Sequence, residues 1–161
     1  MGNKYTIRIN KNTGSDQNYN LLSEKPEISG VSKSNIWANV HQSNESCTDG
    51  ATAEFEVWKT YHGIVGTWRG GAMDGDNFFI GVAGSPDGAS SAPIATFRPE
   101  PGSQYQIHPS NVFFISAGQS MQVGQLVDVA RMRNTLRIDF ANSGPNVTVN
   151  HTPNGQLAIA R

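Results

Sequence analysis

The chain has 161 residues, with 12 basic and 13 acidic side chains, a formal charge of −1 and a pI near 6.4. Its length fits one domain, 1–161, large enough to bury roughly 70% of its extended surface, and its charge balance excludes the basic surface that binds nucleic acid or anionic membranes. Three Trp, four Tyr and seven Phe argue against intrinsic disorder, and the single Cys47 excludes an internal disulfide framework.

The first predicted strand lies near the N-terminus, where the stretch KYTIRI alternates between polar and apolar residues. Tyr5, Ile7 and Ile9 fall on one face of it. A period of two is typical of a strand with one buried face, so this face is predicted to lie on the core.

The stretch NIWANVH, residues 35–41, predicts a second strand whose two faces differ. If the apolar residues at positions 36, 38 and 40 face the core, the intervening side chains line an outer face. An aromatic ring and an amide on such a face can hold a sugar or another polyol. The candidate ligand-binding residues here are Trp37, Asn39 and His41. The alternative is an ordinary outer face with one partly covered Trp.

The stretch VWKTYHGIVGTWRGG, residues 57–71, is the densest aromatic and titratable part of the chain. Phe55 and Val57 alternate with Glu54 and Glu56, which predicts a strand that continues toward residue 68. Aromatic faces give contact area to a small ligand, and polar groups orient it. The further candidate ligand-binding residues are therefore Trp58, Tyr61, Trp68 and Arg69. The alternative is that these aromatic residues simply fill the core.

The stretch AMDGDNFF, residues 72–79, places Asp74 and Asp76 on either side of Gly75. A calcium loop of the EF-hand type needs more oxygen ligands than this segment supplies, because two phenylalanines follow Asn77. A tight turn between two strands is the preferred interpretation, since Gly75 accepts a positive φ and Asp side chains bond to nearby backbone groups. The two carboxylates still lie close in sequence to His62, which keeps an acid–base role open.

Two later segments break the alternation. Residues 84–102 hold half of the eight prolines around one short predicted strand, 94–97, and predict a long Pro/Gly/Ser-rich loop at the rim of the molecule. Residues 121–132, MQVGQLVDVARM, carry apolar residues at helical spacing, but their valines and Gly124 favour an extended strand.

The C-terminal third returns to alternation in the stretches LRIDF, VTVNH and LAIA, separated by turn signals such as Asn154-Gly155. Many short strands divided by such turns predict an all-β fold. We expect a single-domain antiparallel β-sandwich, or a flattened barrel, with short turns and one long loop.

No metal site and no cofactor are predicted. The four histidines, at positions 41, 62, 108 and 151, are widely separated and form no pair at the spacing of zinc ligands. The stretch HGIVG lacks the Ser of a nucleophile elbow, and GTWRGG lacks the Lys and Ser/Thr of a phosphate loop.

The stretch NTGSDQNYNLL, followed by strands and a late RIDF, resembles in general style the compact all-β cytolysins and fruit-body lectins of fungi and bacteria. No diagnostic motif matches residue by residue, so no family is assigned.

Two functional hypotheses follow. The first is a non-catalytic, lectin-like binding module for a neutral polar ligand, with carbohydrate as the preferred class. The second is a small cofactor-independent enzyme of the cyclase or isomerase type, in which His62 and Asp74 or Asp76 move a proton on a ligand held by aromatic residues. A shallow exposed Trp platform would favour the binding module, and an enclosed pocket lined by His62 and an Asp would favour the enzyme.

The expected partner is a small neutral ligand or glycan, with no nucleic acid. No basic segment precedes an apolar run, and no stretch approaches the roughly 18 apolar residues of a membrane span. A cytoplasmic protein without a membrane span is therefore expected, with export by a signal-independent route left open. The oligomeric state, including a homo-oligomer, is also open.

Overall fold

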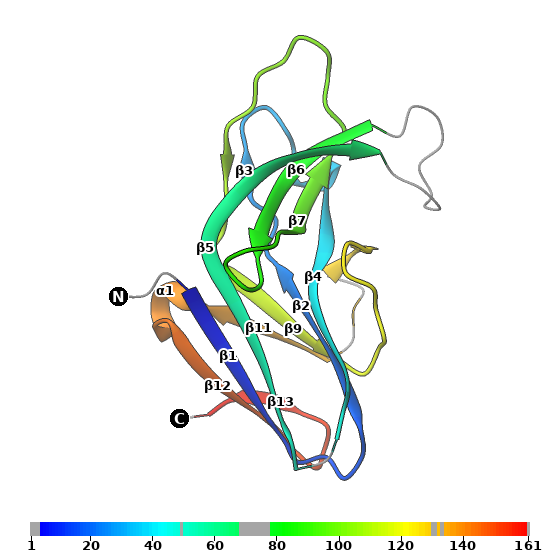
Figure 1. Cartoon of the computed structure of the whole chain (residues 1–161), viewed down its shortest axis with the longest axis vertical. Helices are drawn as coiled ribbons and strands as arrows, with labels where there is room; N and C mark the ends of the chain where they lie inside the picture. Colours follow the sequence, from blue (N-terminus) through cyan, green and yellow to red (C-terminus); the bar gives the residue numbers. More distant parts are fainter. Residues whose placement is uncertain (1–3, 49, 68–77, 130–131, 133, 161) are drawn as a thin grey trace.

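The computed structural model describes residues 4–48, 50–67, 78–129, 132 and 134–160, and these are nearly all β (Figure 1). Two short helical segments accompany the strands: the 3-10 turn η1, Lys33–Asn35, and the helix α1, Phe140–Ser143. The strands are β1 Lys4–Lys11, β2 Gln17–Ser23, β3 Glu27–Ile28, β4 Ile36–Cys47, β5 Thr52–Thr67, β6 Phe78–Ser85, β7 Ala92–Phe97, β8 Ile107–His108, β9 Val112–Ala117, β10 Leu126–Val127, β11 Thr135–Asp139, β12 Asn146–His151 and β13 Leu157–Ile159. The all-β prediction is confirmed.

One sheet contains most of the strands, in the order β11-β9-β2-β4-β7-β6-β5-β1-β12-β13, with β10 paired beside β4. Its two ends approach one another, because Asn134 Nδ2 donates a hydrogen bond of 2.9 Å to the carbonyl of Gly155, in the turn before β13. The sheet is therefore nearly closed. A separate ladder joins β3 to β8.

The sheet is mostly antiparallel, with one exception that the sequence did not indicate. β1 and β12 pair in parallel, with Ile7 beside Val147 and Ile9 beside Val149. The chain reaches this arrangement through α1, which follows β11 directly and leads to β12 beside β1. The prediction of an antiparallel fold is confirmed for most of the sheet, and the β1–β12 pair makes the sheet mixed.

Two long strands connect the two halves of the molecule. The C-terminal half of β4 pairs with β2, whereas its start pairs with β7. In the same way, β5 pairs with β1 through its first half and with β6 through its second. Figure 1 shows β3, β6 and β7 gathered at one end of the molecule and β1, β12 and β13 at the other.

The larger core lies where β2, β9 and β11 face β1, β5 and β12. The alternation read from the sequence accounts for it: Ile7 and Ile9 are fully buried, and Phe55 and Val57 are 2% and 0% exposed. Tyr5 stacks on Phe140 with ring centroids 4.1 Å apart, which closes one end of this core.

A second core lies at the other end of the molecule. There the ladder of β3 and β8 packs against the inner face of β4, β6 and β7 through Ile28, Ile36, Val82, Ile94 and Phe97. The loops that leave β3 and β7 are held on this core, and they form the walls of the pocket described below.

The two segments that break the alternation differ from the prediction. Residues 84–102 are not one long loop, because residues 84–94 form the tip of the β6–β7 hairpin and only the part after Phe97 is an extended connection. Among the described residues of 121–132, the only strand is the two-residue β10. Gly124, with a φ of 89°, and the hydrogen bond from Gln125 N to Gln122 O make a turn where a continuous strand was predicted.

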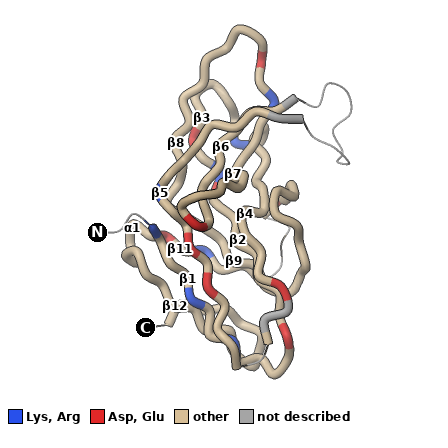
Figure 2. Tube along the Cα trace, in the orientation of Figure 1, with Lys and Arg blue, Asp and Glu red and all other residues tan. Residues whose placement is uncertain are grey.

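Basic and acidic positions lie close together along β1 and β5 (Figure 2). Lys4 pairs with Glu56 at 2.8 Å and Arg8 with Glu54 at 3.0 Å. None of the helices in the described ranges is long and apolar enough to cross a membrane.

Candidate ligand-binding site

An open pocket of about 610 Å³ lies at the end of the molecule that carries the second core. Residues 29–35, around η1, form one wall, and residues 98–105, after β7, form the other. Trp37, near the start of β4, completes the lining. A pocket of this size is within the range of small-molecule sites.

Trp37 is the most prominent apolar surface of this pocket. Its neighbours Ile36 and Ala38 are buried at 1% and 0%, whereas Trp37 itself is 44% exposed. The alternation of β4 therefore turns its indole outward while the strand stays anchored in the core. A large aromatic residue on the surface of a strand, beside a concave wall, offers a flat apolar platform.

Tyr105 forms a second, more rigid aromatic wall. Its ring packs edge-on against the buried Phe97, with centroids 4.8 Å apart. Its hydroxyl oxygen accepts a hydrogen bond of 2.8 Å from the backbone N–H of Glu100. Because that oxygen already accepts a bond from the backbone, its own proton is directed elsewhere and is available to an acceptor on a ligand.

The remaining lining is polar and balanced in charge. Asn35 and Gln104 contribute amide groups, and several serines contribute hydroxyl groups. The two charged side chains are Arg98 and Glu100, and neither makes an ion pair with any residue placed in the structure. The lining thus offers many donors and acceptors with no excess of either charge.

Trp37, Asn39 and His41 were predicted to line an outer face of the strand, but only Trp37 is exposed, because Asn39 and His41 are buried at 2% and 0% exposure. The turn at Gly124 covers Asn39, whose Nδ2 donates to the Gly124 carbonyl at 3.0 Å and whose Oδ1 accepts from Thr96 at 3.2 Å. The β6–β7 hairpin covers His41. Alternation correctly predicts which residues share a face, but it cannot show what packs on that face.

His41 is an unusual buried residue. Neither ring nitrogen has a hydrogen-bond partner within the described chain. Burial lowers the pKa of His41 from 6.5 to about 4, and the nearby backbone of Ala92 and Pro93 offsets only part of this effect.

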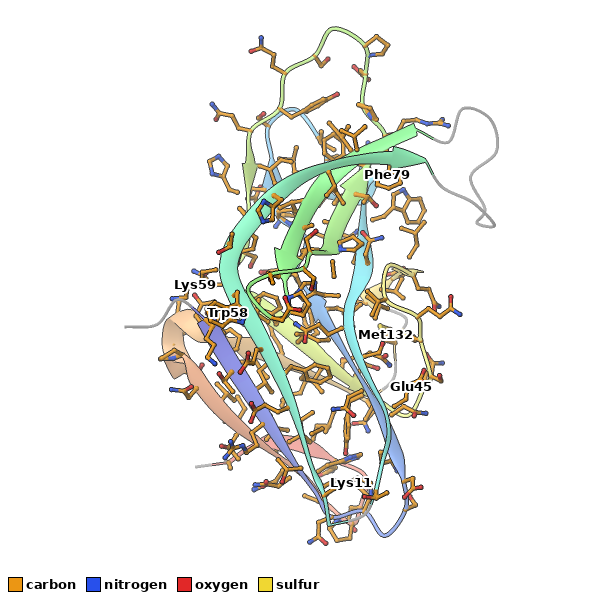
Figure 3. All side chains as sticks on the ribbon, in the orientation of Figure 1. Lys11, Glu45, Trp58, Lys59, Phe79 and Met132 are labelled. Carbon is orange, nitrogen blue, oxygen red and sulfur yellow. The ribbon has the colours of Figure 1, made fainter. Side chains whose placement is uncertain are left out.

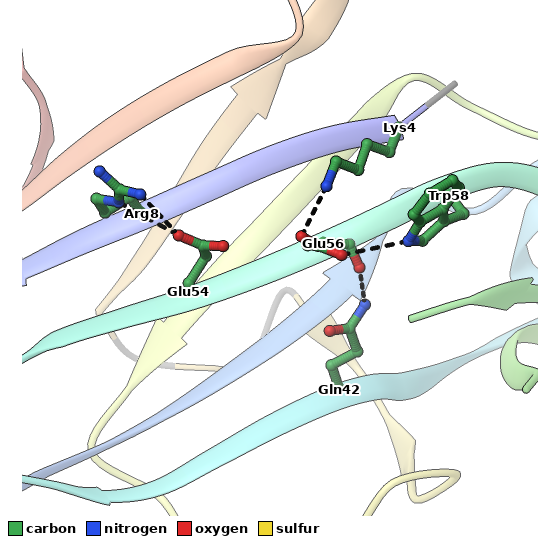
Figure 4. Close-up of polar contacts among 6 residues, drawn as sticks. All are labelled: Lys4, Arg8, Gln42, Glu54, Glu56 and Trp58. Carbon is green, nitrogen blue, oxygen red and sulfur yellow. Dashed lines mark hydrogen bonds and ion pairs between the residues drawn. The ribbon is translucent and has the colours of Figure 1, made fainter. Parts of the chain in front are cut away.

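The side chains of Trp58 and Tyr61 make contacts within the fold. The indole N–H of Trp58 donates to Glu56 at 3.3 Å, and Lys4 Nζ lies 5.3 Å from the ring centroid (Figures 3 and 4). Gly88, in the hairpin turn, packs against the Trp58 ring. Tyr61 packs on the second core, and burial raises the pKa of its hydroxyl. Both belong to the strand predicted from residues 54–69.

The structure brings the remaining predicted site residues together nowhere among the residues that it describes. His62 is exposed on β5, opposite Ala83. Trp68, Arg69, Asp74 and Asp76 lie outside the described residues, so the turn, acid–base and ligand-binding interpretations of that segment remain predictions. The strands on either side pair as predicted, since Thr67 lies opposite Phe78 in an antiparallel hairpin.

The sequence did not single out Arg98, Glu100 and Tyr105 as site residues. The signal nearest to them was the Pro- and Gly-rich segment 84–102, predicted to lie at a rim. Their convergence with residues 29–35 depends on the pairing of β3 with β8, where Glu27 lies opposite His108. Two-residue strands leave no periodic pattern in a sequence.

Among the described residues, no three His, Cys, Asp or Glu side chains gather in a way that could hold a metal ion. Comparison with protein-family models, with curated proteins and with solved structures finds no match for this chain.

Proposed function

We propose that the pocket beside Trp37 binds a neutral polar ligand, with carbohydrate as the preferred class, and that the protein is a non-catalytic, lectin-like β-sandwich module. The observation that carries this proposal is the 44% exposed Trp37 at the edge of a pocket lined mainly by uncharged polar groups. Sugars combine an apolar face of C–H groups with a rim of hydroxyl groups, and this lining is complementary to both.

Each part of the pocket has a role in this proposal. The Trp37 indole stacks on the apolar face of a sugar ring. The proton of the Tyr105 hydroxyl donates to one ring substituent, from a position fixed by Phe97 and the backbone of Glu100. Arg98 and Glu100 supply a donor and an acceptor for neighbouring hydroxyl groups.

The charge balance supports an uncharged ligand over an acidic or basic one. A carboxylate placed at Arg98 would also meet Glu100 in the same pocket, and an ammonium group at Glu100 would meet Arg98. Uncharged hydroxyl groups can bond to both side chains without this conflict.

A glycan array followed by calorimetry tests the proposal. We expect at least one neutral oligosaccharide to bind, Trp37→Ala to weaken that binding at least tenfold, and Trp37→Phe to weaken it less because it keeps an aromatic face. Val65→Ala is the matched control, since Val65 is an apolar side chain that is 68% exposed but lies outside the pocket. Absence of any glycan binding, or equal binding by Trp37→Ala and the unaltered protein, would reject the proposal.

A further inference from the structure

The tip of the β6–β7 hairpin, residues 84–94, is attached to the rest of the sheet by few backbone pairs. β7 pairs with β4 only from Ala95 onward. On the other side, β6 pairs with β5 up to Ala83, opposite His62, and then only at Ser85, where the register has shifted. Between these points the hairpin strands pair mainly with each other.

The turn of the hairpin is internally rigid. Asp87 Oδ1 accepts from the N–H groups of Ala89 and Ser90 at 2.8 and 2.7 Å, and Ser85 Oγ accepts from Gly88 N at 2.7 Å. The hairpin tip can therefore move as one unit without losing its own hydrogen bonds.

Side-chain packing holds this unit in place at two positions. Gly88 rests on the ring of Trp58, which lies on β5. Nearer the base, His41 of β4 lies against Gly84, where a Cβ atom would come within 3.3 Å of the imidazole Cε1 and 2.8 Å of Ile94 Cδ1. The imidazole is enclosed, with 0% of its surface exposed.

The surroundings of His41 favour a neutral ring. The groups placed against it are Gly84 from β6 and Ala92, Pro93 and Ile94 from β7. None of them carries a charge, and neither ring nitrogen has a partner among the residues that the structure places. The nearest charged residue along the hairpin is Asp87, whose carboxylate is already bonded within the turn.

We propose that His41 makes the hairpin of residues 84–94 an acid-released flap, which separates from β4 and the Trp58 ring when the imidazole takes up a proton. A protonated ring in this enclosure meets no carboxylate, and the backbone of Ala92 and Pro93 offsets only part of the cost of burying its charge, whereas opening the flap gives both N–H groups access to water. The flap is the smallest unit whose movement exposes the ring.

The flap is connected to the candidate site through β7. That strand begins in the hairpin and ends at Phe97, beside Arg98, and its Thr96 lies opposite Trp37. Release at low pH would therefore loosen one wall of the pocket and favour dissociation of a ligand. This consequence rests on the proposed function, but the flap itself does not.

Amide hydrogen exchange measured by NMR at pH 7 and pH 5, without any ligand, tests the flap directly. A ring that titrates at 6.5 when exposed and at about 4 when enclosed predicts a roughly twentyfold fall in the protection factors of the hairpin amides between these two pH values. At both pH values the hairpin amides should exchange faster than those of β1, β9 and β12, because the flap opens without unfolding the larger core.

His41→Leu should abolish this fall, with His41→Gln as the second variant if the first does not fold. His108→Gln is the matched control, because His108 is exposed on β8 and should leave the fall unchanged. The proposal is overturned if hairpin protection is the same at both pH values, if the fall persists in both His41 variants, or if the hairpin amides exchange only together with those of β1, β9 and β12. If hydrogen exchange agrees with the flap but no glycan binds, the proposed function is rejected and the flap proposal stands.

Discussion

The backbones of β6 and β7 approach so closely at Gly81 that no side chain fits there. A Cβ atom at this position would overlap the carbonyl oxygen of Ala95 and come within 3.0 Å of Thr96 Cα. Both neighbours belong to β7, which also carries Phe97 of the second core. Gly81 thus fixes the distance between two strands that support the pocket.

Gly81→Ala is expected to lower the free energy of unfolding by about 3 kcal/mol or to prevent folding, because the obstructing atoms belong to the backbone and cannot turn aside. Gly63→Ala is the matched control: Gly63 lies on the neighbouring strand with nothing within 4 Å of its Cβ position. Urea denaturation measures both variants. A Gly81→Ala protein as stable as the Gly63→Ala protein would contradict the close approach.

His151 is a second buried histidine and has a partner. Its Nδ1 lies 2.6 Å from the hydroxyl oxygen of Tyr19, across the larger core. Burial is the main cause that lowers the pKa of His151 below 6.5; the backbone of Gly155 opposes this effect and the positive charge of Lys11 adds to it. The folded protein thus keeps this ring neutral at pH values where the unfolded chain protonates it.

We therefore expect the stabilisation associated with a neutral His151 to be complete above pH 6.5 and to be lost as the pH falls below it, since the unfolded state then binds the additional proton. Denaturation at pH 7.5 and pH 5 measures this. His151→Asn, which keeps a hydrogen-bond acceptor but does not titrate, should lose less stability between the two pH values than the unaltered protein. An equal loss in both proteins would exclude His151 as a cause of acid sensitivity.

At the scale of elements, the two faces of β5 differ in polarity and in how much they contribute to the stability of the fold. Phe55 is 2% exposed in the larger core, whereas the adjacent Glu54 makes an ion pair with Arg8 in which the two side chains are 40% and 58% exposed (Figure 4). Water screens such a pair, so the strand is held by its apolar face.

Phe55→Ala should cost about 3–5 kcal/mol of stability, through lost burial and the cavity that remains. Glu54→Gln, one residue away on the same strand, should change stability by less than about 1 kcal/mol. Chemical denaturation of the two variants compares them directly. A larger effect of Glu54→Gln would show that the outer face of β1 and β5 contributes more than its exposure indicates.

At the scale of the whole molecule, cohesion comes mainly from two apolar cores joined by the long strands β4 and β5, with a smaller third cluster around Leu22, Val40 and Met121. Within the described ranges, no three side chains that could ligate a metal ion gather together. The Asp74–Asp76 segment was interpreted from the sequence as a turn with too few ligands for calcium.

Chelators are therefore expected to leave the melting temperature unchanged, and added calcium or zinc should not raise it. A thermal scan with and without each ion tests this expectation. A shift of several degrees would show that a metal binds the folded state, and it would direct attention to Asp74 and Asp76.

The sequence by itself determined several of the longer strands and much of the larger core. The alternation of Tyr5, Ile7 and Ile9 places side chains on opposite faces of a strand whatever surrounds it, so the buried face could be predicted. Turn residues such as Gly14 and Gly88, with φ of 86° and 82°, act through local backbone geometry in the same way.

Only the tertiary structure decided what covers each face and which distant segments meet. Asn39 and His41 share a face with Trp37, yet the turn at Gly124 and the β6–β7 hairpin bury them, and no local pattern encodes that coverage. The parallel pairing of β1 with β12 and the meeting of residues 29–35 with residues 98–105 depend on contacts between segments far apart in the chain. Local periodicity reports the direction of a side chain, whereas burial and convergence depend on how the whole chain packs.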